Sequence, residues 1–149
     1  MLATAGFAAL LPLTAIADDA VVTSADALKW GPGPPTLPKG AQMVILYGDS
    51  AKEGQFVYRM KFPAGYKIAP HMHPNDENVT VLSGSIHIGM GDQLDPNKGE
   101  TVPAGGYLHM PKGMHHYGWT TEEAVIQGNG VGPAGITYIN PADDPRKTN

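Results

Sequence analysis

The stretch that decides the fold runs from residue 65 to residue 84 and reads GYKIAPHMHPNDENVTVLSG. It carries His71 and His73 with one residue between them, Glu77 four residues later, and a glycine at each end. Side chains on a β-strand return to the same face every second residue, so both imidazole rings are predicted to point the same way. Glu77 follows a Pro-Asn-Asp turn at the start of another extended run. The stretch therefore predicts two strands that bring three metal-preferring side chains together.

Glycine and proline divide the chain into short extended runs. Its 149 residues include 19 Gly and 14 Pro, and only 16% are charged; Gly and Pro punctuate strands and disrupt helix interiors. Residues 55–62 alternate as a half-buried strand does, with Phe56, Tyr58, Met60 and Phe62 on one face. No convincing helix appears. The pattern predicts an antiparallel sandwich or barrel, with strands, besides that of His71 and His73, at residues 20–23, 41–47, 55–62, 77–82, 85–90, 102–111, 115–120, 123–128 and 135–139.

The composition excludes several classes of function. Cysteine is absent, which rules out disulfides, thiolate catalysis, zinc fingers and iron–sulfur ligation. Any metal must be held by nitrogen and oxygen, from the six histidines and the carboxylates. The formal charge is −4 and the Lys and Arg residues are scattered, so no basic stripe exists to neutralise phosphates, and nucleic acid is not an expected partner.

The two ends of the chain differ from its middle. Residues 2–16 are apolar and uncharged, and Ala15-Ile16-Ala17 fits a small-x-small cleavage site, so residues 1–17 are predicted to be a signal peptide. No Lys or Arg precedes this run, and a frayed apolar strand or helix is the alternative. The mature chain would be periplasmic or secreted, without a membrane span. Residues 18–40 read as an extended arm across the domain or as a linker, with Trp30 and Leu37 as anchors. Residues 41–139 form the barrel, and residues 140–149 a polar tail.

Two motifs of this chain resemble the signatures of the cupin superfamily. Gly65, His71, His73, Glu77 and Gly84 match the first signature at every defined position. The second is matched by Gly105, Pro111, Gly113 and His116; the family usually carries Asn where this chain has Thr120, a position that is not a metal ligand. The chain is most similar to small single-domain cupins of the ChrR-like type. The resemblance implies an all-β fold, the antiparallel double-stranded β-helix of the cupin jelly roll.

The resemblance also implies a metal site. Its ligands would be His71, His73, Glu77 and His116, and its ion one divalent transition metal: Fe, Zn, Mn, Ni or Cu. These candidate ligands also have interpretations that involve no metal ion. His71 and His73 could form a surface pair, and Glu77 could be an exposed turn acid.

The remaining histidines and aromatic residues near the second motif have open roles. Family spacing selects His116 over His115, which strand alternation turns away from the ion, to the cavity mouth or the surface. His109 is expected to line the substrate cavity. Tyr117 and Trp119 could frame a substrate, although packing in the core explains them equally well.

Two functions fit these residues. The first is a small-molecule metalloenzyme, either an oxygenase or a Lewis-acid isomerase or lyase, with Glu77 as a catalytic base. The second is a non-catalytic sensor or binding protein that takes up a metal or ligand in the periplasm. The resemblance further implies a homodimer formed through edge strands.

Overall fold

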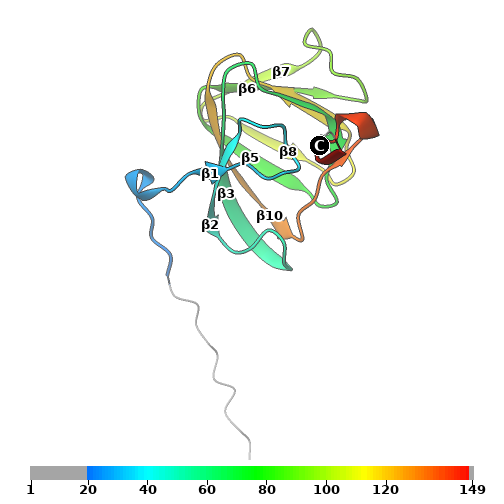
Figure 1. Cartoon of the computed structure of the whole chain (residues 1–149). Helices are drawn as coiled ribbons and strands as arrows, with labels where there is room; N and C mark the ends of the chain where they lie inside the picture. The colour runs from blue at the N-terminus through cyan, green and yellow to red at the C-terminus, as the bar shows by residue number, and fades with distance from the viewer. Residues whose placement is uncertain (1–19, 148–149) are drawn as a thin grey trace, which may run out of the picture.

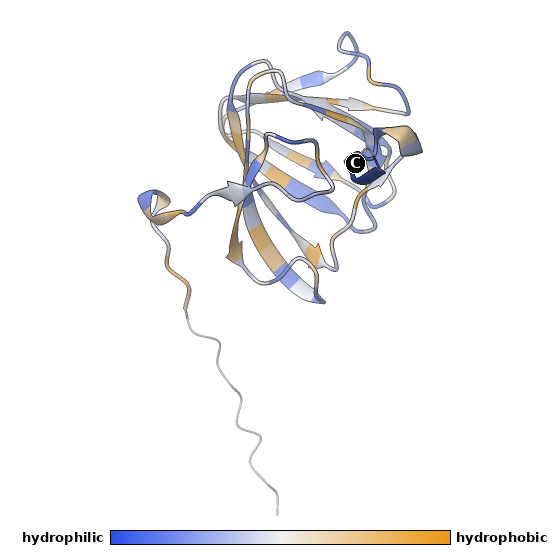
Figure 2. Ribbon diagram, viewed as in Figure 1, coloured by the Kyte–Doolittle hydropathy of each residue, from blue (hydrophilic) through white to orange (hydrophobic). Residues whose placement is uncertain are grey.

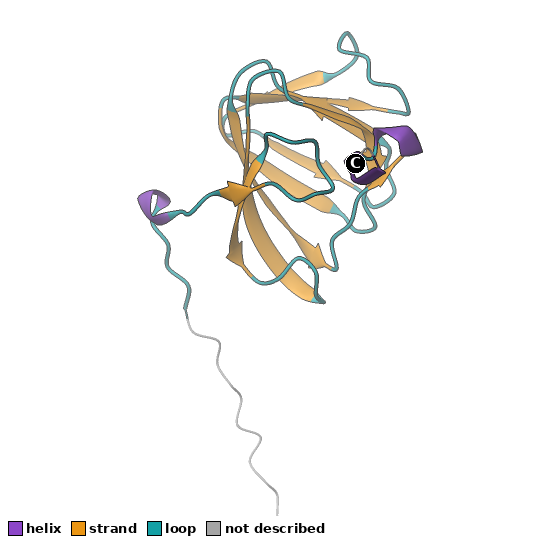
Figure 3. Ribbon diagram, in the orientation of Figure 1, coloured by secondary structure: helices purple, strands orange, loops and turns teal. Residues whose placement is uncertain are grey.

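A computed structural model describes residues 20–147 of the chain as two antiparallel sheets packed into a barrel (Figure 1). One sheet has the strand order β1-β2-β3-β10-β5-β8, and the other β11-β4-β9-β6-β7. Loops connect nearly all of these strands (Figure 3). The strands are β1 (Gly31–Pro32), β2 (Gln42–Tyr47), β3 (Gly54–Phe62), β4 (Lys67–Met72), β5 (Glu77–Ser83), β6 (Ser85–Met90), β7 (Glu100–Pro103), β8 (Tyr107–Met110), β9 (His116–Trp119), β10 (Ala124–Gly132) and β11 (Thr137–Tyr138).

The predicted all-β jelly roll is confirmed, with one local refinement and one local correction. Residues 102–111 were predicted as a strand broken by glycines; the break separates β7 from β8, which lie in different sheets. The chain turns between them at Gly105, whose φ of 85° favours glycine. Residues 20–23 are not a strand; the nearest regular structure is a single 3-10 turn at Ala25–Ala27. Two further 3-10 turns, Pro141–Asp143 and Pro145–Lys147, lie near the end of the chain.

The core fills the space between the two sheets. Along β3 the predicted alternation is observed, with Phe56, Met60 and Phe62 buried. Met60 and Phe62 belong to one core cluster with buried side chains of the other strands, including Val81 and Leu108. Apolar and polar positions accordingly alternate along the strands (Figure 2). Burial of one face of each sheet is the main stabilising contribution expected for such a barrel.

A glycine corner connects the two sheets within the opening stretch of sequence. Gly84 joins β5 of one sheet to β6 of the other with a φ of 65°. A Cβ atom there would lie 2.2 Å from the carbonyl oxygen of Glu123. Because neither the conformation nor the space admits a side chain, this corner requires glycine.

The segment before the barrel lies across it as an extended arm. Pro32 and Gly31 pair with β2, and the ring of Trp30 lies 4.9 Å from the Lys61 amine. Leu37 packs against the core, and the Tyr138 hydroxyl donates a hydrogen bond to the Thr36 carbonyl at 2.8 Å. Both predicted anchors therefore contact the domain.

No helix within residues 20–147 is long and apolar enough to cross a membrane. The predicted signal peptide, residues 1–17, lies outside the residues that the structure describes.

Candidate metal centre

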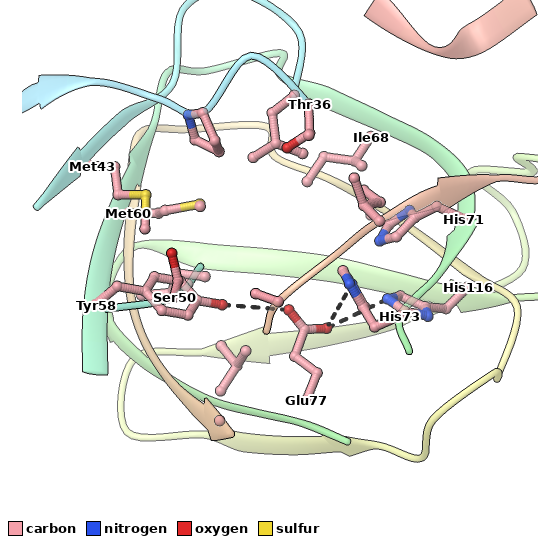
Figure 4. A pocket seen from close by; sticks show the side chains of 18 of the residues that line it. Thr36, Met43, Ser50, Tyr58, Met60, Ile68, His71, His73, Glu77 and His116 are labelled. Atoms are coloured by element: carbon pink, nitrogen blue, oxygen red, sulfur yellow. Dashed lines mark hydrogen bonds and ion pairs between the residues drawn. The ribbon is translucent and has the colours of Figure 1, made fainter. Parts of the chain in front are cut away.

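Three histidines of the two motifs converge inside the barrel (Figure 4). His71 on β4 and His116 on β9 are direct cross-strand partners, with ring centroids 4.2 Å apart. His73 follows the end of β4, and its ring centroid lies 5.0 Å from that of His71. One ring nitrogen from each lies within 4.8 Å of those of the other two. A histidine cluster of this kind can bind a metal ion.

Backbone carbonyls determine which nitrogen of each ring faces the centre of the cluster. The Nδ1 atoms lie 2.8 Å from Ala69 O for His71, 2.7 Å from Gly135 O for His73, and 2.9 Å from Met114 O for His116. A carbonyl can only accept, so each Nδ1 carries the hydrogen and donates it. In the neutral ring the lone pair is then on Nε2. The three rings are thus held in the tautomer that metal ligation through Nε2 requires.

Glu77, the first residue of β5, links this cluster to a tyrosine. Its Oε2 lies 3.4 Å from His116 Nε2 and 3.5 Å from His73 Nε2. Its Oε1 lies 3.5 Å from the Tyr58 hydroxyl, which donates toward it (Figure 4). The carboxylate therefore faces the histidines with one oxygen and the tyrosine with the other.

Burial and neighbouring charges shift the protonation of these groups. Desolvation, reinforced by the nearby His116, lowers the pKa of His71 to about 3, so its ring stays neutral at ordinary pH. Burial alone would raise the pKa of Glu77, but the neighbouring imidazole rings, His116 foremost, outweigh it and lower that pKa. Both shifts favour the protonation states that a metal ligand needs.

The donor set fits a divalent transition metal. His73 Nε2 is buried and makes no hydrogen bond within the described part of the chain, and only the carboxylate of Glu77 approaches it, at 3.5 Å. A buried polar atom without a hydrogen-bond partner is costly unless something else satisfies it. Imidazole nitrogens and a carboxylate oxygen are ligands of Zn, Fe, Mn, Ni and Cu. The residues present therefore fit the kind of ion that the sequence motifs imply.

The histidine cluster lies in the wall of a cavity of about 360 Å³. The cavity reaches between the two sheets, and the arm closes part of it through Pro34, Thr36 and Leu37. Most of the other side chains that line it are apolar, among them Met43, Met60, Phe62, Ile68, Leu108 and Ile126. A pocket of this size with few polar groups is typical of small-molecule binding.

Three residues predicted to line the substrate cavity lie elsewhere, which corrects that expectation. His109 is exposed on the outer face of β8, where its Nδ1 donates to Asn78 Oδ1. His115 pairs with Asp92 at 2.6 Å. Tyr117 is buried, and its hydroxyl donates to the Lys98 carbonyl. None of the three is among the described residues lining the cavity.

Trp119 is the fourth residue that was predicted to line the substrate cavity. It borders the cavity, but its ring stacks with those of His87 and Tyr117, at centroid distances of 5.0 and 6.0 Å. Because side chains alternate along β9, Tyr117 and Trp119 point to the face opposite His116. Alternation in the sequence alone could have shown this.

Two residues that shape the site carried no signal in the sequence motifs. Tyr58 on β3 reaches Glu77 across Gly128 of β10, its cross-strand partner. Asn75 donates to the carbonyls of Val131 and Pro133, both at 3.0 Å. These bonds hold the loop that brings Gly135 O to His73. Alternation did place Tyr58 on the inner face, but its contact with Glu77 depends on strand register.

Several solved structures are similar to this barrel in fold. The polyketide cyclase RemF of Streptomyces resistomycificus is similar over 85% of this chain and 89% of its own, with 16% identity and a TM-score of 0.70. A candidate acetylacetone dioxygenase of Methylibium petroleiphilum is similar over 91% of this chain and 90% of its own, with 18% identity and a TM-score of 0.66. An oxalate oxidase in complex with glycolate, at 23% identity and a TM-score of 0.56, covers 85% of this chain and 67% of its own. At these identities the likeness concerns the fold.

The family is defined more narrowly by sequence. The model of the ChrR cupin-like domain matches residues 18–133, and the chain belongs to this family. No curated protein matches it significantly in sequence. The resemblance expected from the two motifs is thereby confirmed at the level of the family.

Proposed function

We propose that the chain holds one divalent transition metal through His71, His73, His116 and Glu77 and acts on a small molecule in the adjoining cavity. One observation carries this proposal: each of the three rings donates Nδ1–H to a backbone carbonyl, which leaves the lone pair on Nε2, and the three histidines bring one ring nitrogen each within 4.8 Å of the others. An arrangement that served only to pack the rings would not need the same tautomer three times.

The residues around the cluster suggest how the chain contributes to a reaction. A bound metal would supply Lewis-acid or redox chemistry to a substrate oxygen. Glu77 would either stay on the metal or release it to accept a proton from a substrate in the cavity, since its carboxylate lies at the cavity wall. Tyr58, by donating toward Glu77 Oε1, keeps that carboxylate oriented toward the histidines.

Metal content tests the proposal directly. Wild-type protein dialysed against each of Fe, Zn, Mn, Ni and Cu and then desalted should retain about one equivalent of at least one of them, measured by plasma mass spectrometry. His116→Gln should lose this metal. His115→Gln is the matched control, because His115 is the adjacent histidine and contacts Asp92 instead. Equal metal content in the two variants would contradict the proposed ligand set.

Catalysis requires a separate measurement. The structural similarity to a candidate acetylacetone dioxygenase makes acetylacetone a reasonable first probe of oxygenase activity. Metal-loaded protein should consume oxygen and probe together, and His116→Gln should do neither. The same assay without oxygen, read by mass spectrometry of the probe, detects isomerase or lyase chemistry. Binding without consumption would favour the alternative, a non-catalytic binding or sensor protein.

We further propose a homodimer and export of the chain. The outer face of the six-stranded sheet carries exposed apolar side chains, among them Leu82 and Tyr107, which supports association of two copies. The apolar run at residues 2–16 supports export to the periplasm or beyond. Light scattering that gives a monomer would contradict the first proposal, and native protein that retains Met1 would contradict the second.

A further inference from the structure

The cavity lining separates into one polar end and an apolar remainder. Figure 4 shows His71, His73, His116 and Glu77 close together, with Met43 and Met60 away from the histidines. The apolar walls come from both sheets, through residues such as Phe62, Ile86, Leu108 and Ile126. A ligand that fills the cavity would therefore contact hydrogen-bonding groups at one end and hydrocarbon elsewhere.

Several other polar side chains of the lining are already engaged, and those of Thr36, Ser50 and Asn129 carry no charge. Asn75 donates to two backbone carbonyls, and Asp76 Oδ1 accepts from the backbone N–H of Lys112 at 2.9 Å. Thr120 accepts from the backbone N–H of Tyr66 and donates to the Pro63 carbonyl. These groups hold loops and turns in place, so they are poorly available to a ligand.

No cation balances a ligand charge away from the cluster. Among the described residues that line the cavity, none is Lys or Arg, whereas Asp76 and Glu77 are acidic. A carboxylate in the apolar part would lose its hydration without gaining a counter-ion, which is strongly unfavourable. An oxygen placed at the histidine end would find the clustered imidazoles and Glu77 as partners.

The volume sets the size of the ligand. An apolar protein cavity of about 150 Å³ accommodates benzene, so the 360 Å³ found here is enough for about two rings. Met43 and Met60 have flexible, polarizable side chains that can adapt to such a shape.

We propose that the substrate or ligand of this site is a predominantly apolar molecule of about two rings, with a single oxygen-bearing end that lies at Glu77 and the histidines. This inference rests on the proposed function, because it takes the histidine cluster as the reactive end of the cavity. It excludes dicarboxylates and other ligands charged at both ends.

A matched pair of probes tests the inference. We expect 2-naphthol to bind wild-type protein with a stoichiometry of one in isothermal titration calorimetry, with or without metal. Naphthalene-2,6-dicarboxylate has the same ring system with a charge at each end and should bind roughly 100-fold more weakly or not at all. Equal or tighter binding of the dicarboxylate would overturn the inference, and so would the absence of 2-naphthol binding.

A variant of the apolar wall provides a second test. Met43→Lys places a cation in the cavity wall, so that a buried carboxylate of the dicarboxylate would form a charge pair instead of lying unpaired. The ratio of the dissociation constants of the two probes should therefore fall by at least about tenfold. The control is Met90→Lys, because Met90 is exposed and outside the cavity lining. If circular dichroism shows that Met43→Lys does not fold, Met43→Trp should instead weaken 2-naphthol binding by filling the cavity, and Met90→Trp should not. Equal effects of the Met43 and Met90 substitutions on probe binding would overturn the inference.

Metal analysis of the same samples separates this inference from the proposed function. Retained metal without 2-naphthol binding would overturn the inference and leave the metal site standing. Binding of 2-naphthol by protein that takes up no metal would support the apolar site and contradict the proposed function.

Discussion

The contact of Tyr58 with Gly128 leads to a specific prediction about stability. In the structure, a Cβ atom added at Gly128 would lie 2.2 Å from Tyr58 Cζ, 2.3 Å from its hydroxyl oxygen and 2.6 Å from Cε1. Real Cβ atoms do not approach other atoms so closely, so in Gly128→Ala the ring must move away from Glu77. Overpacking of this kind costs about 1–3 kcal/mol.

The backbone effect of the same substitution has the opposite sign. Replacing glycine by alanine in a strand interior stabilises the protein by about 0.5–1 kcal/mol when the conformation suits both residues. Gly128 has no positive φ, so this gain applies. We therefore expect Gly128→Ala to lower the free energy of unfolding by about 0.5–2 kcal/mol, measured by urea denaturation.

A control glycine and a double-mutant cycle isolate the clash. At Gly118, which also lines the cavity, a Cβ would lie 3.4 Å from His87 O and 3.8 Å from Ile88 Cδ1, which is ordinary contact. Gly118→Ala should be neutral or slightly stabilising. In a Tyr58→Ala background the clashing ring is absent, so Gly128→Ala should no longer lower the free energy of unfolding. The coupling energy between the two substitutions should then be about 1–3 kcal/mol. In Tyr58→Phe the ring carbons remain and the cost should persist. The reasoning is refuted if Gly128→Ala costs the same with and without the ring.

Three further perturbations have defined outcomes. Asn75→Ala releases the loop that supplies the carbonyl to His73, and metal affinity measured by competition with a chelator should fall by about tenfold or more. Tyr138→Phe removes the hydrogen bond to Thr36 and should lower the free energy of unfolding by about 1 kcal/mol and speed proteolysis of the arm. For metal-free protein, burial lowers the pKa of His71 in the folded state to about 3, from the ordinary histidine value of 6.5. Between these two pKa values the unfolded chain binds a proton that the folded chain does not. The contribution of neutral His71 to the free energy of unfolding is therefore fully present above pH 6.5, and about 2 kcal/mol of it should be lost at pH 5.

Each of these predictions has a matched comparison. Asn97→Ala removes an asparagine that contacts only Asp95 of its own turn, and its metal affinity should equal that of the wild type. Tyr107→Phe removes an exposed hydroxyl bond to Asn78 and should leave proteolysis of the arm unchanged. In metal-free His71→Gln the loss of stability toward pH 5 should be about 2 kcal/mol smaller; an identical pH profile would contradict the assignment to His71.

Strand alternation accounts for much of what the sequence predicted. It placed His71 and His73 on one face and turned His115 away from His116. It also identified the side chains on the buried face of β3. Applied to Tyr117, it would also have avoided placing that side chain at the substrate, whereas Trp119 does border the cavity. The prediction for His109 failed for a different reason: nothing within residues 102–111 indicated which face of β8 would be inside, because the turn at Gly105 restarts the alternation.

The sequence by itself determined most of the strands, the glycine corner at Gly84 and the pairing of His71 with His73 on one face, because these follow from the geometry of the chain over a few residues; His116 was selected by the family resemblance. Even the tautomers of His71 and His116 are local, since each ring donates to the carbonyl two residues earlier. The tautomer of His73 depends instead on Gly135, which is 62 residues away. Only the tertiary structure decided this contact, the reach of Tyr58 to Glu77 and the apolar cavity. All three arise from the register between strands and the packing of loops, which local periodicity leaves open.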